Sequence, residues 1–256
     1  MIAPAPFAMS VRALLFASVA AVAMTACASN RTSMPSPDYS GMPAAESHQN
    51  LAELGARYKQ HPKDKAAIIH YAAALRAVGQ SSQAVAVLEA GMAYHPTDPE
   101  VRVAYAKALT AAGRLEQSLQ VIDNTIRPDI PDWNALLVKG ATLDQMGRNQ
   151  EARMLYQQAL TIAPGEASIA ANLGLSYAMS NDLAQAEQHL RQAVQMPGAN
   201  SRHWQNLALV VGLQGRFEEC RALYAAELPP EQVENNMNYV RALLTQQNRW
   251  DAIAQG

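Results

Sequence analysis

Cysteine, charge of one sign and aromatic side chains are all scarce in this sequence of 256 residues. Only two cysteines occur, Cys27 and Cys220, which excludes a disulfide scaffold and zinc sites built from cysteine pairs. The formal net charge is −2 without a long run of one sign, so the sequence predicts neither nucleic-acid binding nor a polybasic membrane patch. Aromatic residues make up 6% and hydrophobic residues 49%, and this excess of Ala and Leu favours helices over strands.

Catalytic and metal-binding motifs are also missing. The six histidines form no His-x-x-x-His or His-Glu-x-x-His pair, and Gly-x-Ser-x-Gly, Walker-type and Gly-x-Gly-x-x-Gly loops are absent. Asp144 and Glu151 flank an expected turn and are interpreted as solvated charges, while Cys220 is interpreted as a packed, inert thiol. The sequence therefore predicts no enzyme activity, no cofactor and no metal site.

The N-terminus of the chain has the form of a secretory signal. Arg12 is the only charged residue before Arg31, and apolar or small residues follow it from Ala13 to Met24. This stretch is shorter than the roughly 20 residues that a membrane-spanning helix needs. Residues 1–26 are therefore predicted to be a signal peptide.

The residues before the first cysteine are Met24, Thr25 and Ala26. This order, ending at Cys27, resembles the bacterial lipobox, which implies that Cys27 receives a diacylglycerol on its sulfur. Ala28 follows it, and no Asp stands there to signal retention in the inner membrane. The resemblance thus implies a lipid anchor in the outer membrane, facing the periplasm. An ordinary signal peptide cut after Ala23 is the alternative.

Residues 27–47 read as a tether that carries the lipidated cysteine. Small residues, polar residues and Pro dominate this stretch, and no periodicity is visible. Such a composition buries too little apolar surface to offset the entropy of the chain. It is predicted to be a flexible connection between the lipid and the folded domain.

A 34-residue period organises the remainder of the chain. Gly, or once Asn, the residues that most readily take a left-handed backbone conformation, recurs in this register. These expected turn residues are Gly79, Gly113, Gly147, Asn181 and Gly215.

Small residues recur on both sides of each turn, where two helices would cross closely. Seven residues before the turn stand Ala72, Ala106, Gly140, Gly174 and Ala208. Five residues after it stand Ala84, Ser118, Ala152, Ala186 and Cys220. Large apolar residues recur four before the turn and nine after it, as in Leu75 and Leu88. The pattern predicts helical hairpins.

Each period has the same order of residue types: small, large, turn residue, small, large and a closing proline. This order resembles the tetratricopeptide repeat (TPR). The resemblance implies an all-α fold, a right-handed superhelical solenoid of helix-turn-helix hairpins. Five repeats are expected over 65–233, with a half-repeat helix over 48–62 and degenerate capping helices over 234–256. Ile130 replaces the closing proline of the second repeat, which predicts a differently turned junction.

In a TPR stack the first helix of each hairpin lines the concave surface, so the resemblance implies protein binding there. First helices are expected to begin at Lys65, Pro99, Trp133, Ala167 and Ser201. The expected groove residues are Arg76, Lys107, Asp144, Gln145, Leu175, Met179, Gln205, Leu209 and Leu213.

This expected groove is polar in its first three repeats and mostly apolar in its last two. Some TPR proteins hold a partner's C-terminal carboxylate, but Lys107 is the only basic residue at the corresponding fifth and ninth positions, so this clamp is not expected. The apolar end suits an amphipathic helix or an extended segment of a partner. Alternatively, the C-terminal helices around Val240–Leu244 cover it.

Three stretches are more distinctive than the repeat itself: Trp204–Phe217, Leu143–Arg148 and Asn172–Tyr177. They resemble the TPR lipoprotein of the Tad (tight adherence, Flp pilus) system, its D component. The resemblance implies a role in assembling a type IV-like pilus, with the outer-membrane secretin or other Tad components as partners. A general cell-envelope adaptor for cell-wall enzymes or outer-membrane assembly and, more remotely, a periplasmic enzyme with a TPR body stay open.

Overall fold

The computed structural model of the chain describes residues 37–39, 42 and 44–254. The predicted signal peptide and Cys27 lie outside the described residues. The described part contains twelve α-helices and, in place of any strand, one isolated antiparallel bridge between Arg127 and Ile130. None of the helices described is long and apolar enough to cross a membrane.

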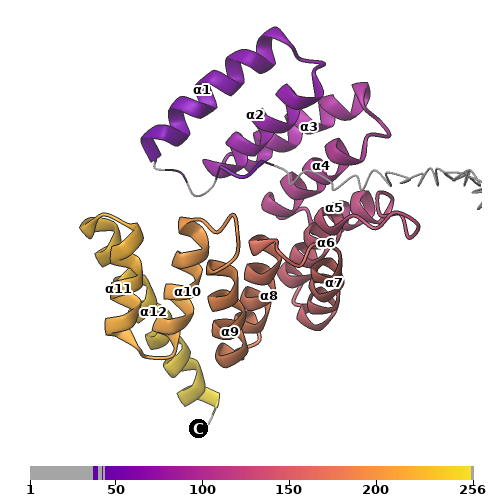
Figure 1. The fold of residues 1–256 in the computed structure, drawn as a ribbon. Helices are drawn as coiled ribbons and strands as arrows, with labels where there is room; N and C mark the ends of the chain where they lie inside the picture. Colours follow the sequence, from indigo (N-terminus) through magenta and orange to yellow (C-terminus); the bar gives the residue numbers. More distant parts are fainter. Residues whose placement is uncertain (1–36, 40–41, 43, 255–256) are drawn as a thin grey trace, which may run out of the picture. The chain divides into compact units, whose positions relative to one another are not determined.

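Ten of the helices form five consecutive hairpins (Figure 1). The first helices are α2 (Lys65–Ala77), α4 (Pro99–Ala111), α6 (Trp133–Gln145), α8 (Ala167–Met179) and α10 (Ser201–Leu213). Their partners are α3 (Ser81–Tyr94), α5 (Leu115–Asp123), α7 (Asn149–Ile162), α9 (Leu183–Val194) and α11 (Phe217–Glu227). The predicted all-α solenoid of hairpins is confirmed, and each first helix begins at the residue that the 34-residue register gives.

The turn of every hairpin is closed in the same way. Gly79, Gly113, Gly147 and Gly215 have φ between 74° and 82°, and Asn181 has φ of 60°. In the first turn, the N–H of Gln80 donates to the carbonyl of Leu75 at 2.8 Å, the bond of a Schellman motif. The same bond recurs in the other four turns. A left-handed residue therefore ends each first helix and directs the chain into the second.

A second repeating signal, absent from the sequence interpretation, starts the first helices. An acidic residue or Asn precedes each of them at 34-residue spacing: Asp64, Asp98, Asp132, Glu166 and Asn200. The side chains of Asp64, Asp98, Asp132 and Asn200 accept hydrogen bonds from N–H groups of the first helical turn. These caps satisfy donors that have no partner inside the helix, so they fix where each repeat begins.

The two helices of a hairpin cross where the small residues stand. All ten predicted small positions are buried. Gly140 of α6 lies against the Tyr156 ring of α7, so that an added Cβ would stand 2.8 Å from the ring carbon Cζ. Gly174 meets Leu190 of α9 in the same way, with an added Cβ at 2.8 Å from Cγ. Where the second helix carries a large side chain at the crossing, the first helix thus needs a residue without one.

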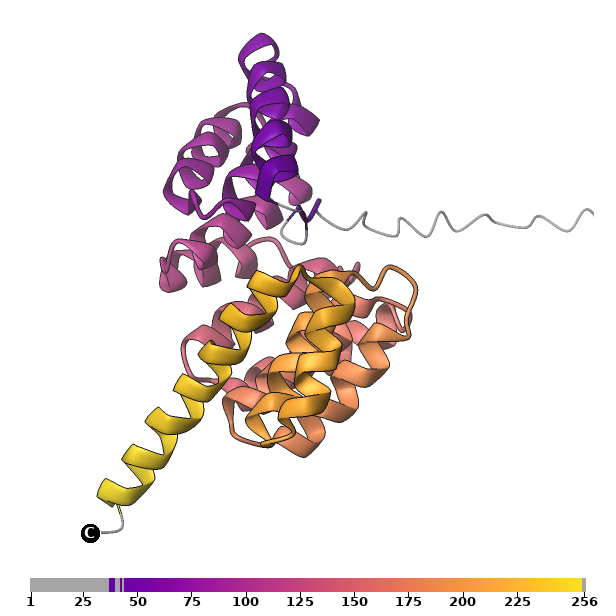
Figure 2. The same cartoon turned by 90° about the vertical axis from the view of Figure 1, so that its left-hand side faces the viewer.

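The two ends of the repeat array are closed by single helices. Helix α1 (Ala44–Gln60) packs on α2, where the rings of Tyr58 and Tyr71 stack with centroids 5.2 Å apart. Helix α12 (Pro230–Ala254) lies against α10 and α11 (Figure 2) and buries Met237 completely. Each end helix covers an apolar face that would otherwise meet water.

Both ends of the described chain differ from the predicted boundaries. Helix α1 begins at Ala44, inside the expected tether, and Ser47 is buried there, with its hydroxyl donating to the carbonyl of Met42 at 3.3 Å. Residues 37–39 of the expected tether also lie against the repeats. At the other end, one continuous helix from Pro230 replaces the several capping helices expected over 234–256.

The junction after the second repeat is built differently from the others. Helix α5 has nine residues, whereas α3 and α7 have 14. The chain then forms the Arg127–Ile130 bridge, and the Ile130 side chain stays 60% exposed. Absence of the closing proline thus accompanies the altered turn that the sequence predicts there.

An ion-pair network joins the fourth and fifth hairpins. The Glu187 carboxylate accepts hydrogen bonds from Arg216 at 2.7 Å, Gln214 at 2.9 Å and Arg191 at 2.8 Å. Burial of Glu187 works to raise the pKa of its carboxyl, but these hydrogen bonds outweigh it and lower the pKa to about 2. The network therefore favours the ionised form of Glu187 in the folded protein.

We predict that Gly140→Ala lowers the free energy of unfolding by about 1–3 kcal/mol, because the new methyl group meets the buried Tyr156 ring. The loss exceeds the gain of up to about 1 kcal/mol from replacing Gly within a helix. Urea unfolding followed by circular dichroism measures it. Gly165→Ala is the control, since nothing lies within 4 Å of a Cβ there; equal stability of the two variants would contradict the crossing geometry.

We predict that Glu187→Gln removes about 2 kcal/mol of stability at pH 7 and progressively less in acid. The pKa of Glu187 is lower in the folded than in the unfolded protein, so its contribution is present above about pH 4.5 and disappears as the pH falls towards 2. Urea unfolding of both proteins between pH 7 and pH 3 measures the difference. The exposed Glu116→Gln is the control, and a difference that does not change with pH would exclude the mechanism.

Candidate protein-binding groove

The first helices of all five hairpins contribute to one groove with a volume of about 900 Å³. Helices α2, α4, α6, α8 and α10 line it, and Pro37 and Asp38 from the N-terminal segment lie along it. Polar side chains such as Asn172, Gln205 and Asn206 alternate with apolar ones such as Leu137. The groove therefore offers hydrogen-bonding groups on a partly apolar floor.

Sequence reasoning placed nine residues in this groove, and the structure brings five of them together there. The lining includes Arg76, Lys107, Gln145, Leu175 and Gln205. It does not include Asp144, Met179, Leu209 or Leu213. The four that fall outside lie on α6, α8 and α10 but not on the faces of these helices that line the groove.

Asp144 is the clear correction. It was predicted to face the groove as a solvated charge, but it is only 6% exposed. Its carboxylate accepts hydrogen bonds from the Tyr156 hydroxyl at 2.8 Å, from Asn149 at 2.8 Å and from the Ser176 hydroxyl at 2.7 Å. These donors come from α7, its N-terminus and α8, so Asp144 holds two repeats together and is not available to a partner.

The same link occurs one repeat earlier. The Thr110 hydroxyl lies 2.8 Å from the hydroxyls of Ser118 and Thr142, and all three are buried. Thr110 and Asp144 stand one 34-residue period apart, as do Thr142 and Ser176. The return of polar residues at these two positions of the repeat was therefore the sequence signal for the buried hydrogen bonds, although polarity alone suggested solvent exposure.

The apolar end of the expected groove is divided between two environments. Leu209 is half-buried and packs against a core cluster to which α12 contributes Val233, Met237 and Val240. Met179 remains 56% exposed. The proposed covering by C-terminal residues thus applies to the surroundings of Leu209 and not to Met179.

Positive charge gathers at one side of the groove. Arg76 of α2 and Lys107 of α4 are half-buried, and neither has an ion pair within the part of the chain that the structure describes. The pKa of Lys107 is lowered to about 8, mainly by burial and then by the nearby guanidinium of Arg76, while acidic neighbours oppose the shift. Arg202 of α10 lies along the same groove. The pKa of Arg76 is lowered mainly by burial, and the charge of Arg202 lowers it further.

Two acidic residues of the groove have local hydrogen-bonding roles. Asp132 caps α6 by accepting from the Asn134 N–H at 2.8 Å, and Glu166 accepts from the Ser168 hydroxyl at 2.9 Å. Asp38, by contrast, comes from the N-terminal segment and faces Arg202, with 3.9 Å between Oδ2 and Nη1. Sequence reasoning missed Asp38 because it treated residues 27–47 as a tether.

His, Cys, Asp and Glu side chains do not gather in threes to hold a metal ion anywhere in the described ranges. Cys220 is fully buried with its sulfur 3.5 Å from that of Met237, and burial raises the pKa of its thiol. It therefore packs as a small apolar group, as its register position predicts. The groove presents amides, hydroxyls and separated charges, which are suited to binding.

Comparison with known proteins fits this geometry. Family models of the tetratricopeptide repeat match residues 75–138 and 133–197. The hairpins within residues 75–197 are tetratricopeptide repeats. A human relative, tetratricopeptide repeat protein 7A, is 32% identical over 85 residues, which are 33% of this chain and 10% of that protein. The match thus spans about a tenth of the relative's length.

Two solved structures share the TPR fold. A thermophilic TPR protein from Thermus thermophilus has a TM-score of 0.62 and 19% identity, covering 72% of this chain and 99% of its own. PilW, described as a widely conserved type IV pilus biogenesis factor, has a TM-score of 0.56 and 17% identity, covering 75% of this chain and 90% of its own. At these identities the likeness concerns the fold.

We predict that Asp144→Ala lowers the free energy of unfolding by about 2–4 kcal/mol, because three buried donors lose their acceptor. Thermal and urea unfolding measure the loss. The neighbouring Gln145→Ala is the matched control, since Gln145 is exposed in the groove and should change stability by less than about 0.5 kcal/mol. Similar stability of both variants would show that Asp144 is not a structural carboxylate.

Proposed function

We propose that this chain is a non-enzymatic TPR lipoprotein that binds proteins at the outer membrane, facing the periplasm, and supports assembly of a Tad (Flp) pilus. The observation that carries the binding role is the groove, to which the first helices of all five hairpins contribute. One partner segment lying in it would contact every repeat, so the array acts as a scaffold.

The chemistry of the groove favours recognition over catalysis. Its amide side chains, among them Gln145, Asn172 and Asn206, can pair with the N–H and C=O groups of an extended partner. Apolar residues such as Leu137 and Leu175 add contact area between them. This alternation suits a peptide that uses its backbone and a few side chains.

The pilus assignment rests on sequence resemblance. Trp204–Phe217 and two shorter stretches resemble the Tad lipoprotein, and PilW supplies a pilus biogenesis factor that shares the fold at 17% identity. On this proposal, the groove holds a segment of the outer-membrane secretin or of another Tad component. Binding would place or stabilise that component at the membrane.

The anchor is proposed at Cys27. Several acyl chains on the N-terminal cysteine would hold the protein firmly, since each buried methylene contributes about 0.8 kcal/mol. Residues between Cys27 and α1 would then set how far the groove stands from the membrane. A scaffold fixed in this way stays near a secretin in the same membrane.

We predict that deletion of the gene abolishes surface pili and adhesion, and that reintroducing the wild-type gene restores both. Cys27→Ala should release the protein into the soluble periplasmic fraction and fail to restore normal pilus numbers, because the scaffold leaves the membrane. Electron microscopy of surface pili and membrane fractionation measure these outcomes.

Cys220→Ala is the matched control, since this buried cysteine occupies a position where other repeats carry Ala, and membrane attachment should persist. Unchanged pili after deletion would reject the Tad role and favour a general envelope adaptor. Globomycin-sensitive processing that continues in Cys27→Ala would reject the lipobox.

A further inference from the structure

Pro37 and Asp38 of the N-terminal segment line the groove that the proposed function assigns to a partner, and Tyr39 next to them contacts α2. We propose that the groove recognises an extended partner segment carrying an isolated aspartate or glutamate, and that Pro37–Tyr39 occupies the same site and competes with it. This inference rests on the proposed protein-binding function and adds to it the chemistry of the partner.

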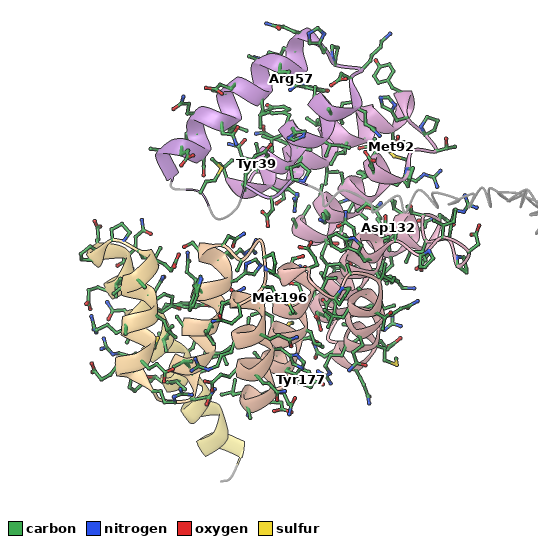
Figure 3. All side chains as sticks on the ribbon, in the orientation of Figure 1. Tyr39, Arg57, Met92, Asp132, Tyr177 and Met196 are labelled. Carbon is green, nitrogen blue, oxygen red and sulfur yellow. The ribbon has the colours of Figure 1, made fainter. Side chains whose placement is uncertain are left out.

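Side chains of the segment contact two helices of the repeat array. The Tyr39 hydroxyl lies 2.5 Å from Nδ1 of His70 on α2, and Figure 3 shows Tyr39 beside the first hairpins. Asp38 faces Arg202 of α10 at 3.9 Å. Contacts of three consecutive residues thus reach both the first and the fifth repeat, although the segment has no helical structure.

Asp38 places a carboxylate near the cations of the groove. Burial lowers the pKa of Arg76, and among its charged neighbours Asp38 raises this pKa while Arg202 lowers it. Burial likewise dominates at Lys107, where Arg76 also lowers the pKa and Asp38 raises it. One carboxylate therefore offsets the repulsion among cations that three different repeats bring together.

Other charges of the groove limit the ligand to an isolated acid. Asp132 and Glu166 also raise the pKa of Lys107, and His203 lies on the same side with a pKa that burial lowers. A polyacidic segment would be repelled by these two carboxylates. A single acidic side chain at the place of Asp38, flanked by residues that hydrogen-bond through their backbone, satisfies the site.

Solvent exposure of the contact between Asp38 and Arg202 makes displacement of the segment feasible. The side chains of Asp38 and Arg202 are both more than half exposed, so solvent screens the attraction between them. The segment gains its occupancy from being attached to the chain, which gives it a high effective concentration. A partner with better contacts can therefore replace it, so the segment sets the minimum affinity that a partner needs in order to bind.

The test uses the purified full-length protein and a fluorescein-labelled peptide with the sequence of residues 35–41 as the probe. Fluorescence anisotropy gives its dissociation constant. Asp38→Ala in the protein removes the carboxylate of the internal competitor, so the peptide should bind about tenfold more tightly than to the wild type. Raising the ionic strength should weaken this binding.

Three changes identify the interaction in the Asp38→Ala background. An Asp38→Asn version of the peptide, or Lys107→Gln or Arg76→Gln in the protein, should weaken binding about tenfold, because each change removes one charge from the attraction between the aspartate and the groove cations. Lys139→Gln is the control, because Lys139 pairs with Asp123 outside the groove and the affinity should not change. The peptide variant leaves the protein's folding untouched.

Equal binding of the acidic and neutral peptides, or no binding to Asp38→Ala protein, would overturn the inference. Binding that is no tighter to Asp38→Ala than to wild type would overturn the competition. These outcomes are independent of the pilus counts. If deletion of the gene abolishes pili but the peptide does not bind, only this inference is rejected. Unchanged pili with a peptide that binds as expected reject only the proposed function.

Discussion

The close crossing of the two helices in each hairpin is the constraint on which the rest of this structure depends. At Gly140 the backbone of α6 lies against the Tyr156 ring, and at Gly174 the backbone of α8 lies against Leu190. A larger residue at either point would push the axes apart and move the next hairpin with them. Because each repeat contacts mainly its neighbours, an error of this kind propagates along the array and changes the groove that the first helices line.

Hydrogen bonds between polar side chains join one repeat to the next. Asp144 receives hydrogen bonds from α7, its start and α8, while Thr110 reaches Thr142 across the preceding boundary. These contacts fix the relative rotation of neighbouring hairpins more narrowly than apolar packing does, since hydrogen bonds depend on direction. Glu187 does the same on the exposed side between the fourth and fifth hairpins. The groove is therefore framed by polar contacts between repeats, and of these residues Thr110 also lines it.

Much of the fold was predictable because its signals are local. A left-handed residue at Gly79, small residues around it and the return of this pattern one repeat later identify a hairpin without knowledge of its neighbours. The groove was only half predictable. Arg76 and Lys107 follow from position within the repeat, whereas Asp144 was misplaced because a carboxylate was assumed to need water. Its donors, Tyr156 and Ser176, stand 12 and 32 residues away, beyond the reach of a local rule.

The sequence by itself determined the repeat: where helices begin and turn, which faces are small or large, and how many hairpins follow one another. It did so because capping, left-handed turns and helix crossings involve residues within one period. Only the tertiary structure decided which polar side chains are buried, that α12 is one helix, and that Asp38 lies with Arg76, Lys107 and Arg202. Those outcomes depend on the stacking of hairpins, which brings the first and fifth repeats to one groove and thereby sets its charge.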